Sequence, residues 1–285
     1  MGAPGSGLHR IRIRAILAAG LLLLSSLSSE ARSSFGPLKP KGFCSALASK
    51  FRKPLVFDSA KQASTEEMLR SNPITRVEPI KDREDACILH FRNGERGLFK
   101  FDLGYRDHDY HAEVAAYEVA KRLGIMNVPP TVFRKVQVFP GEGGVRDGSV
   151  QYWIPDSRPV SGLRAKPFMD AGAKRFRREY LNLDRGLEFL DHLIGNWDRN
   201  SGNLVYRFSS DGPEQFGIDH AAAFAEKTWT QAELSELEPA PEWIARLRDP
   251  DAAGWRELLS SSGLKPAQVE VFLKNRAAIL ERHGR

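Results

Sequence analysis

The chain has 285 residues, which is enough for one large domain or for two lobes that share a cleft. Hydrophobic residues make up 41% and charged residues 27% of the chain, ordinary values for a globular protein that exclude wholesale disorder. The net charge of +6 favours anionic partners such as nucleotide phosphates, acidic proteins or membrane surfaces.

The first 31 residues have the pattern of a targeting segment. A basic stretch at residues 9–14 precedes an apolar stretch at residues 15–27, and small residues around Ala31 offer a cleavage point. A span needs about 20 apolar residues, so the pattern favours a cleaved signal peptide. We therefore expect a protein of the secretory-pathway lumen, secreted or periplasmic. The alternative is an uncleaved signal anchor that associates with a membrane through residues 15–29.

Residues 32–73 are rich in Ser, Lys and Pro, and we expect them to form an extension that packs loosely on the first lobe, with a short helix at residues 64–69. The two cysteines of the chain, Cys44 and Cys87, allow at most one intramolecular disulfide in an exported protein. The alternative is that Cys87, which lies in an apolar run, is simply a buried small hydrophobe. Neither cysteine has a setting that indicates zinc binding or thiol catalysis.

A β-rich first lobe is expected over residues 74–154. Residues 86–91 and 97–101 are apolar runs on either side of an Asn-Gly pair, which is a strong short-range signal for a β-hairpin. Two further strands are predicted at residues 132–139 and 150–154, separated by a Gly-rich turn.

A lysine and a glutamate in this lobe are candidate nucleotide-binding residues. Lys100 lies between two phenylalanines of the second hairpin strand, so its side chain emerges on the face opposite to theirs. Glu113 follows in the first turn of an amphipathic helix predicted over residues 111–123, which ends at Gly124. Kinases use such a pair to hold the lysine at the nucleotide phosphates. The simpler alternative is a solvent-facing lysine and a glutamate favoured by the helix dipole.

The sequence contains no glycine-rich nucleotide motif, neither G-x-G-x-x-G nor a P-loop. Backbone amides of residues 81–85 or of residues 93–97 are the two candidates for a phosphate lid, and the sequence does not decide between them. Gln151 and Trp153 fall near the expected junction of the lobes, where their backbone would meet the nucleotide base. An ordinary hairpin strand is the simpler interpretation of these two residues.

From residue 155 to residue 285 the chain reads as a mainly helical second lobe. Helices are predicted at residues 168–182, 184–194, 231–237, 242–247, 252–259 and 266–281. His192 is interpreted as a packed or hydrogen-bonded histidine rather than a base. The basic run at residues 174–178 is interpreted as a solvated helix face, and without a recognisable nucleic-acid module no nucleic acid is expected as a partner.

The strongest functional signal lies in residues 187–224. Asp198 and Asn203 are five positions apart in the polar loop GNWDRNSGN, and Asp219 follows a predicted strand at residues 215–218. Phosphoryl transfer needs an Asp that orients the acceptor hydroxyl, and an Asn and a second Asp that hold metal ions on the phosphates. Magnesium prefers such hard oxygen ligands.

The loops GNWDRNSGN and IDHAAAF resemble the catalytic and metal-binding loops of a group of atypical kinases. This group includes the secretory-pathway (Golgi) protein and glycan kinases, the phosphatidylinositol 3- and 4-kinases and the HipA-like kinases. The resemblance implies that Asp198 is the catalytic Asp, Asn203 a metal ligand and Asp219 the main metal ligand. His220 and Ala221 stand where Asn and Gly are usual, and Ala reaches positive φ only at a cost.

The resulting expectation is an α+β protein with a two-lobed protein-kinase-like fold. With Mg²⁺ or Mn²⁺ it would transfer the γ-phosphate of ATP to a hydroxyl of protein Ser/Thr or of a glycan. Arg199 would either neutralise the transferred phosphate or brace the loop through Asp191 or Asp219. The alternatives are a pseudokinase scaffold that binds nucleotide, a lipid kinase of the phosphoinositide type, and a protein that binds lipid surfaces through its basic run.

Overall fold

The chain is described here from a computed structural model, which covers residues 54–103, 109–138, 144–159, 184–210, 212–225 and 229–284. The predicted targeting segment, Cys44, and the predicted helix at residues 168–182 with its basic run lie outside these ranges, and what we expect of them stays a prediction. Within the described ranges, no helix has the length and apolar character needed to cross a membrane.

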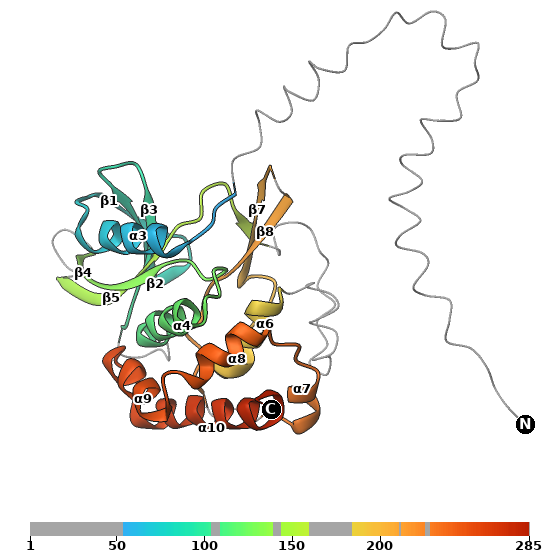
Figure 1. The fold of residues 1–285 in the computed structure, drawn as a ribbon. Helices are drawn as coiled ribbons and strands as arrows, with labels where there is room; N and C mark the ends of the chain where they lie inside the picture. Colours follow the sequence, from blue (N-terminus) through green and yellow to red (C-terminus); the bar gives the residue numbers. More distant parts are fainter. Residues whose placement is uncertain are drawn as a thin grey trace, which may run out of the picture. The chain divides into compact units, whose positions relative to one another are not determined.

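A five-stranded antiparallel sheet with the strand order β1-β2-β3-β5-β4 forms the first lobe (Figure 1). Its strands are β1 (Ile74–Ile80), β2 (Arg83–Phe91), β3 (Arg96–Phe101), β4 (Thr131–Gln137) and β5 (Val145–Tyr152). The hairpin predicted from the Asn-Gly pair joins β2 to β3, and Gly94 takes the left-handed conformation with φ 84°. Strand β5 begins at Val145 rather than at residue 150, because its polar first half pairs with β4 at the edge of the sheet.

Helix α3 (Ser59–Ser71) begins well before the predicted residue 64, at an N-cap where the Asp58 carboxylate accepts from the main-chain N–H of Lys61. Phe57 and Leu69 are fully buried, and they share a core with Phe99 of β3. The expectation of loose packing is therefore wrong for the described part of this segment. The sequence hid this contact because the helix is mostly polar and buries few residues.

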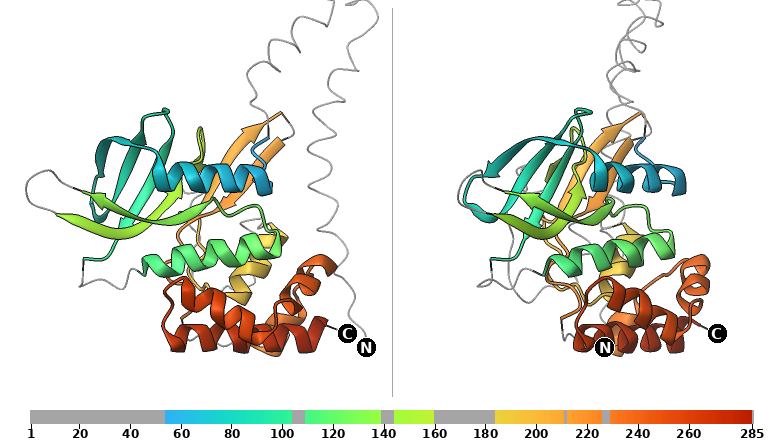
Figure 2. Two further views of the ribbon diagram at one scale, coloured as in Figure 1. Left: turned by 60° about the vertical axis from the view of Figure 1, so that its left-hand side comes forward. Right: turned by 90° about the vertical axis from the view of Figure 1, so that its left-hand side faces the viewer.

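Helix α4 (Tyr110–Leu123) lies on the opposite side of the β4–β5 strands from α3 (Figure 2). It starts at the predicted place, with Asp109 as N-cap, and it ends at Gly124, which has φ 78°. Nine of its 14 residues are buried. Its inner residues share one hydrophobic core with the helices of the second lobe, so α4 is fixed from both sides.

The second lobe contains a small sheet of β6 (Arg158–Pro159), β7 (Leu204–Ser209) and β8 (Gly212–Gly217), and the helices α6 (Arg185–Leu193), α7 (Gln231–Ser235), α8 (Pro241–Arg248), α9 (Ala252–Ser261) and α10 (Pro266–His283). The predicted helices of this lobe are confirmed wherever the structure describes them. Asp184 caps α6 by accepting from the N–H of Gly186 at 2.8 Å.

Two smaller predictions are also tested. His192 donates from Nδ1 to the carbonyl oxygen of Glu188 at 2.8 Å and packs on Trp229, so it is a packed, hydrogen-bonded histidine as expected. Cys87 is a free, fully buried thiol whose pKa is raised by burial to about 12, as expected of a small hydrophobe.

Glu66 fastens α3 to α4. Its Oε1 accepts a hydrogen bond from the Tyr117 hydroxyl at 2.7 Å and from Lys121 Nζ at 2.6 Å, and its Oε2 accepts from Arg70 at 3.2 Å. Burial by itself would raise the pKa of this carboxyl. The hydrogen bonds from Lys121 and Tyr117, together with the charge of Lys121, outweigh burial and hold the pKa below its usual value.

We predict that Glu66→Ala lowers the free energy of unfolding by about 2 kcal/mol at pH 7, because it leaves a buried hydroxyl without its acceptor. The folded pKa is depressed, so the contribution of Glu66 is complete above the unfolded pKa of about 4.3 and is lost as the pH falls through the folded value. Urea unfolding between pH 7 and pH 3 measures both effects. Glu67→Ala, at an exposed position on the same helix, is the control, and equal losses in the two variants would contradict the prediction.

Candidate active site

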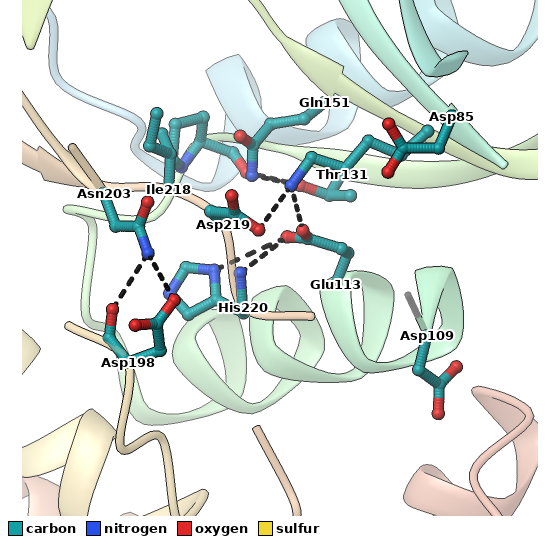
Figure 3. Close-up of polar contacts among 12 residues, drawn as sticks. Asp85, Asp109, Glu113, Thr131, Gln151, Asp198, Asn203, Ile218, Asp219 and His220 are labelled. Atoms are coloured by element: carbon teal, nitrogen blue, oxygen red, sulfur yellow. Dashed lines mark hydrogen bonds and ion pairs between the residues drawn. The ribbon is translucent and has the colours of Figure 1, made fainter. Parts of the chain in front are cut away.

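The strand lysine, the helix glutamate and the second aspartate meet in one cluster, and Figure 3 shows the Glu113 and Asp219 carboxylates close together. Lys100 Nζ donates to Glu113 Oε1 and, at 2.7 Å, to Asp219 Oδ1. Lys100 is 7% exposed and Glu113 is 2% exposed, which excludes the alternative of a solvent-facing lysine. The three residues come from β3, from α4 and from the loop after β8, so the cluster connects the first lobe to the second.

Both members of the buried pair stay charged. Burial alone would lower the pKa of Lys100, but the charges of Glu113 and Asp219 outweigh it and raise the pKa. Burial alone would raise the pKa of Glu113, but the Lys100 charge, with further help from His220, holds it well below the usual value. A buried pair of this kind is stable only while both partners are present.

The loop after α6 holds the first aspartate in a fixed orientation. Asn203 Nδ2 donates to the carbonyl oxygen of Asp198 at 2.9 Å and to its Oδ2 at 3.2 Å, and Asn200 Nδ2 donates to Oδ1 at 3.2 Å. The amide oxygen of Asn203 therefore lies on the side away from Asp198 (Figure 3). Asn200 was not predicted from the sequence, although its place two residues after Asp198 is a usable signal.

Main-chain pairing brings the two predicted loops together. The N–H of Ile218 donates to the carbonyl oxygen of Asn203 at 3.0 Å, which places Asn203 beside the residue that precedes Asp219. Asp198 and Asn203 are thus close to Asp219 in Figure 3, and Asp219 in turn accepts from Lys100.

Arg199 is a structural brace. It is 3% exposed, and its Nε and Nη2 donate to the two carboxylate oxygens of Asp191, each at 2.9 Å. Its Nη1 donates to the carbonyl oxygens of Asn203 at 2.6 Å and Ile218 at 2.7 Å, so it ties the two loops together. The expectation that Arg199 neutralises a transferred phosphate is wrong, because its donors are used inside the protein. The other expectation, that Arg199 braces the loop through Asp191, is confirmed.

His220 connects this brace to the lysine cluster. It is fully buried, and its main-chain N–H donates to Glu113 Oε2 at 3.0 Å. Its Nε2 lies 2.8 Å from Arg199 Nη2. Because arginine only donates, Nε2 must accept, and the imidazole is neutral. Burial and the charge of Arg199 keep the pKa of His220 below its usual value, in agreement with this assignment.

The residues of this loop in the left-handed region are Asp219, with φ 57°, and Phe224, with φ 60°, and not Ala221. The expected cost of an alanine in place of glycine is therefore absent. Aspartate is among the non-glycine residues that enter this region most readily, since its short polar side chain bonds locally. The sequence could not show which residues of the loop take a positive φ.

Gln151 and Trp153 lie at the end of β5, which finishes at Tyr152. The N–H of Trp153 donates to the carbonyl oxygen of Arg96 at 3.0 Å, which extends the pairing of β3 with β5. Gln151 is 5% exposed, and its Nε2 donates to Thr131 Oγ1 at 3.1 Å beside the lysine cluster (Figure 3). These contacts are those of a strand and its end, and the expected contact of the backbone with a nucleotide base stays a prediction.

The donor set suits a hard divalent cation. In the described part of the chain, no group of three or more His, Cys, Asp or Glu side chains is arranged to hold a metal ion. A kinase-type magnesium site does not require one, since one or two protein oxygens and the substrate phosphates complete the shell. The carboxylate of Asp219 and the amide oxygen of Asn203 are ligands of this kind.

Comparisons with known proteins identify the fold. No protein-family model and no curated protein sequence matches the chain. The solved structure of the Golgi casein kinase aligns with 80% of this chain, and the alignment covers 77% of the kinase chain, with TM-score 0.55 and 17% sequence identity. The structure of this kinase with Mn/ADP bound aligns with 79% of this chain and 77% of its own chain length, with TM-score 0.54 and 18% sequence identity. The structure of hydra Fam20 with sugar matches 82% and 92%, with TM-score 0.53 and 14% identity.

At these identities the likeness shows the fold alone. The chain has the α+β, two-lobed fold of the atypical, secretory-pathway type of kinase that the two loops indicated. The predicted fold class and the predicted structural resemblance are confirmed.

We predict that Arg199→Lys lowers the free energy of unfolding by about 3 kcal/mol, because a lysine cannot satisfy a carboxylate and two carbonyl oxygens at once. The matched control is Arg185→Lys, since Arg185 is also in this lobe but its side chain is 61% exposed. Chemical denaturation at pH 7 measures the difference. A loss no greater than that of the control would show that Arg199 does not brace the loops.

Proposed function

We propose that the protein is an exported atypical kinase that transfers the γ-phosphate of ATP to a hydroxyl of protein Ser/Thr or of a glycan. One observation carries the proposal: Lys100, held by Glu113 of α4, reaches Asp219 across the two lobes. In protein kinases the lysine–glutamate pair and the metal-binding aspartate must both be in place for phosphate transfer. The Asp198–Asn203 contact, next to the same loop, supplies the remaining two residues that the reaction requires.

The side chains then have separate roles. Asp198, oriented by Asn203 and Asn200, would accept the proton of the attacking hydroxyl. Lys100 would hold the α- and β-phosphates, and Glu113 would keep its amine in position. Asp219 and Asn203 would hold Mg²⁺ or Mn²⁺, and the chemistry that such an ion supplies is neutralisation of charge on the phosphate oxygens. A neighbouring structure contains Mn and ADP, which supports the choice of cofactors.

Charge makes a metal necessary. Lys100 contributes one positive charge, and Glu113 and Asp219 contribute two negative charges, so the cluster carries a net charge of −1. A free triphosphate would be repelled by this cluster at short range. A nucleotide with bound divalent cations would not be, so nucleotide binding and metal binding are expected to go together.

Transfer of phosphate from labelled ATP tests the proposal. We predict that Asp198→Asn and Asp219→Asn each lower the rate at least about 100-fold, and that removal of divalent metal abolishes it. Asparagine is chosen because it tolerates the left-handed conformation of Asp219, so a loss reports on charge rather than on backbone strain. Asp156→Asn is the matched control, since Asp156 is an exposed aspartate with φ 58°.

The acceptors in this assay distinguish the alternatives. Casein, a glycan and phosphoinositide vesicles would be offered in parallel, and transfer to the vesicles alone would indicate a lipid kinase. Binding of ATP without transfer, unchanged by Asp198→Asn, would indicate a pseudokinase scaffold. His220 in place of the usual Asn favours that alternative, whereas the intact cluster around Lys100 favours the enzyme.

Export is proposed from the pattern of residues 9–31. We predict that the mature chain, produced in cells with a secretory pathway, begins near residue 32 and is recovered outside the cytoplasm. N-terminal sequencing and fractionation measure this. An intact N-terminus on a membrane-bound protein would instead indicate an uncleaved anchor at residues 15–29.

A further inference from the structure

The β1–β2 turn and the β2–β3 turn are the two candidates for a segment that covers the nucleotide phosphates. The strand register shows which of them lies near Lys100. Ala86 of β2 is paired directly with Lys100. Arg83, at the β1–β2 turn, is three residues from Ala86, which is at most about 10 Å along a strand. Asn93, in the β2–β3 turn, is seven residues from Lys100, or about 23 Å along a strand. The β1–β2 turn is therefore at the end of the sheet where the Lys100 amine lies.

The start of β2 contains a register shift. Because of this shift, the direction of the Arg83 side chain does not follow from the regular alternation of side chains along a strand. Pro79 of β1 pairs with Cys87 of β2, but the next residue, Ile80, pairs with Arg83, so three residues of β2 are left without a partner on β1. Bulges of this kind re-aim side chains and are frequent next to active sites. Asp85 and Ala86, within the bulge, are both buried.

A buried carboxylate holds the Arg83 guanidinium. Arg83 Nε donates to Asp85 Oδ1 at 2.8 Å, and Nη2 donates to Oδ2 at 3.1 Å. The Asp85 side chain is 2% exposed, whereas that of Arg83 is 34% exposed. The bond with Asp85, and then the charges of Asp219 and Glu113, raise the pKa of Arg83, which is the effect of nearby carboxylates on a cation that shares their space.

The remaining donors of Arg83 fit a phosphate. A guanidinium carries five N–H donors, and the bidentate contact with Asp85 uses two of them. Its planar fork matches phosphate oxygens, and its charge is permanent. Because Asp85 fixes the side chain in advance, little conformational freedom is lost when a ligand binds.

We propose that Arg83, held by Asp85, binds the terminal phosphates of the nucleotide and takes the place of the glycine-rich loop that this chain lacks. The inference rests on the proposed function, since it requires a nucleoside triphosphate at Lys100. It assigns the phosphate contact to a side chain, where glycine-rich loops use main-chain amides. The rival interpretation is an ordinary strand ion pair, which at this exposure contributes little to stability and nothing to nucleotide binding.

Calorimetric titration of the full chain with Mg·ATP and with adenosine tests the inference. We expect Arg83→Gln to weaken Mg·ATP binding about 10- to 100-fold, the value of hydrogen bonds to a charged group, and to leave adenosine binding unchanged. Arg83→Lys keeps the charge but not the fork, so its loss of affinity is expected to be smaller. Arg92→Gln, an exposed residue beside the more distant turn, removes the same charge and is expected to bind like the natural chain.

Adenosine serves as the internal control for folding, because a damaged fold loses both ligands. If Arg83→Gln loses affinity for both ligands, the double variant Arg83→Gln/Asp85→Asn is measured instead, because it leaves no unpaired buried charge. The inference requires that this double variant lose affinity for Mg·ATP and keep its affinity for adenosine. Unchanged Mg·ATP binding by Arg83→Gln overturns this inference and leaves the kinase proposal standing. A natural chain that does not bind Mg·ATP overturns both.

Discussion

The site depends on one buried carboxylate, that of Glu113. One of its oxygens accepts from Lys100 of the sheet, and the other accepts from the main-chain N–H of His220 in the second lobe. Because Glu113 is 2% exposed, an unpaired charge there would be costly, and each of its two partners is therefore held in place. A single side chain of α4 thus fixes both the lysine and the loop that carries Asp219.

His220, which stands where Asn is usual, has a physical role in its neutral form. A protonated His220 would compete with Lys100 for the charge of Glu113, whereas the neutral ring does not. Arg199 enforces the neutral form, because it donates to Nε2 and adds a positive charge nearby. The departure from the usual Asn is accommodated by the Arg199–Asp191 brace behind it, and the position of Asp219 is retained.

Elements with local signals were predictable from the sequence. The Asn-Gly hairpin, the end of α4 at Gly124 and the cap of α6 at Asp184 each depend on a few neighbouring residues, and each lies where it was expected. Strand and helix periodicity placed Lys100 and Glu113 on their elements, and their pairing was expected from the way kinases hold a strand lysine. Other features depend on contacts between distant segments, which no local sequence pattern indicates. These are the start of α3, the polar half of β5, the bracing role of Arg199 and the positive φ of Asp219.

The packing of α4 also limits how such a site can be regulated. In many protein kinases, activity is controlled by moving the helix that carries the glutamate. Here the alanines of α4, Ala112, Ala115, Ala116 and Ala120, are fully buried, and α4 shares a core with the second lobe while Glu66 fastens it to α3. Small side chains let the neighbouring elements approach closely, so displacing the helix would open well-packed cores. The lysine–glutamate pair is consequently a fixed part of this fold.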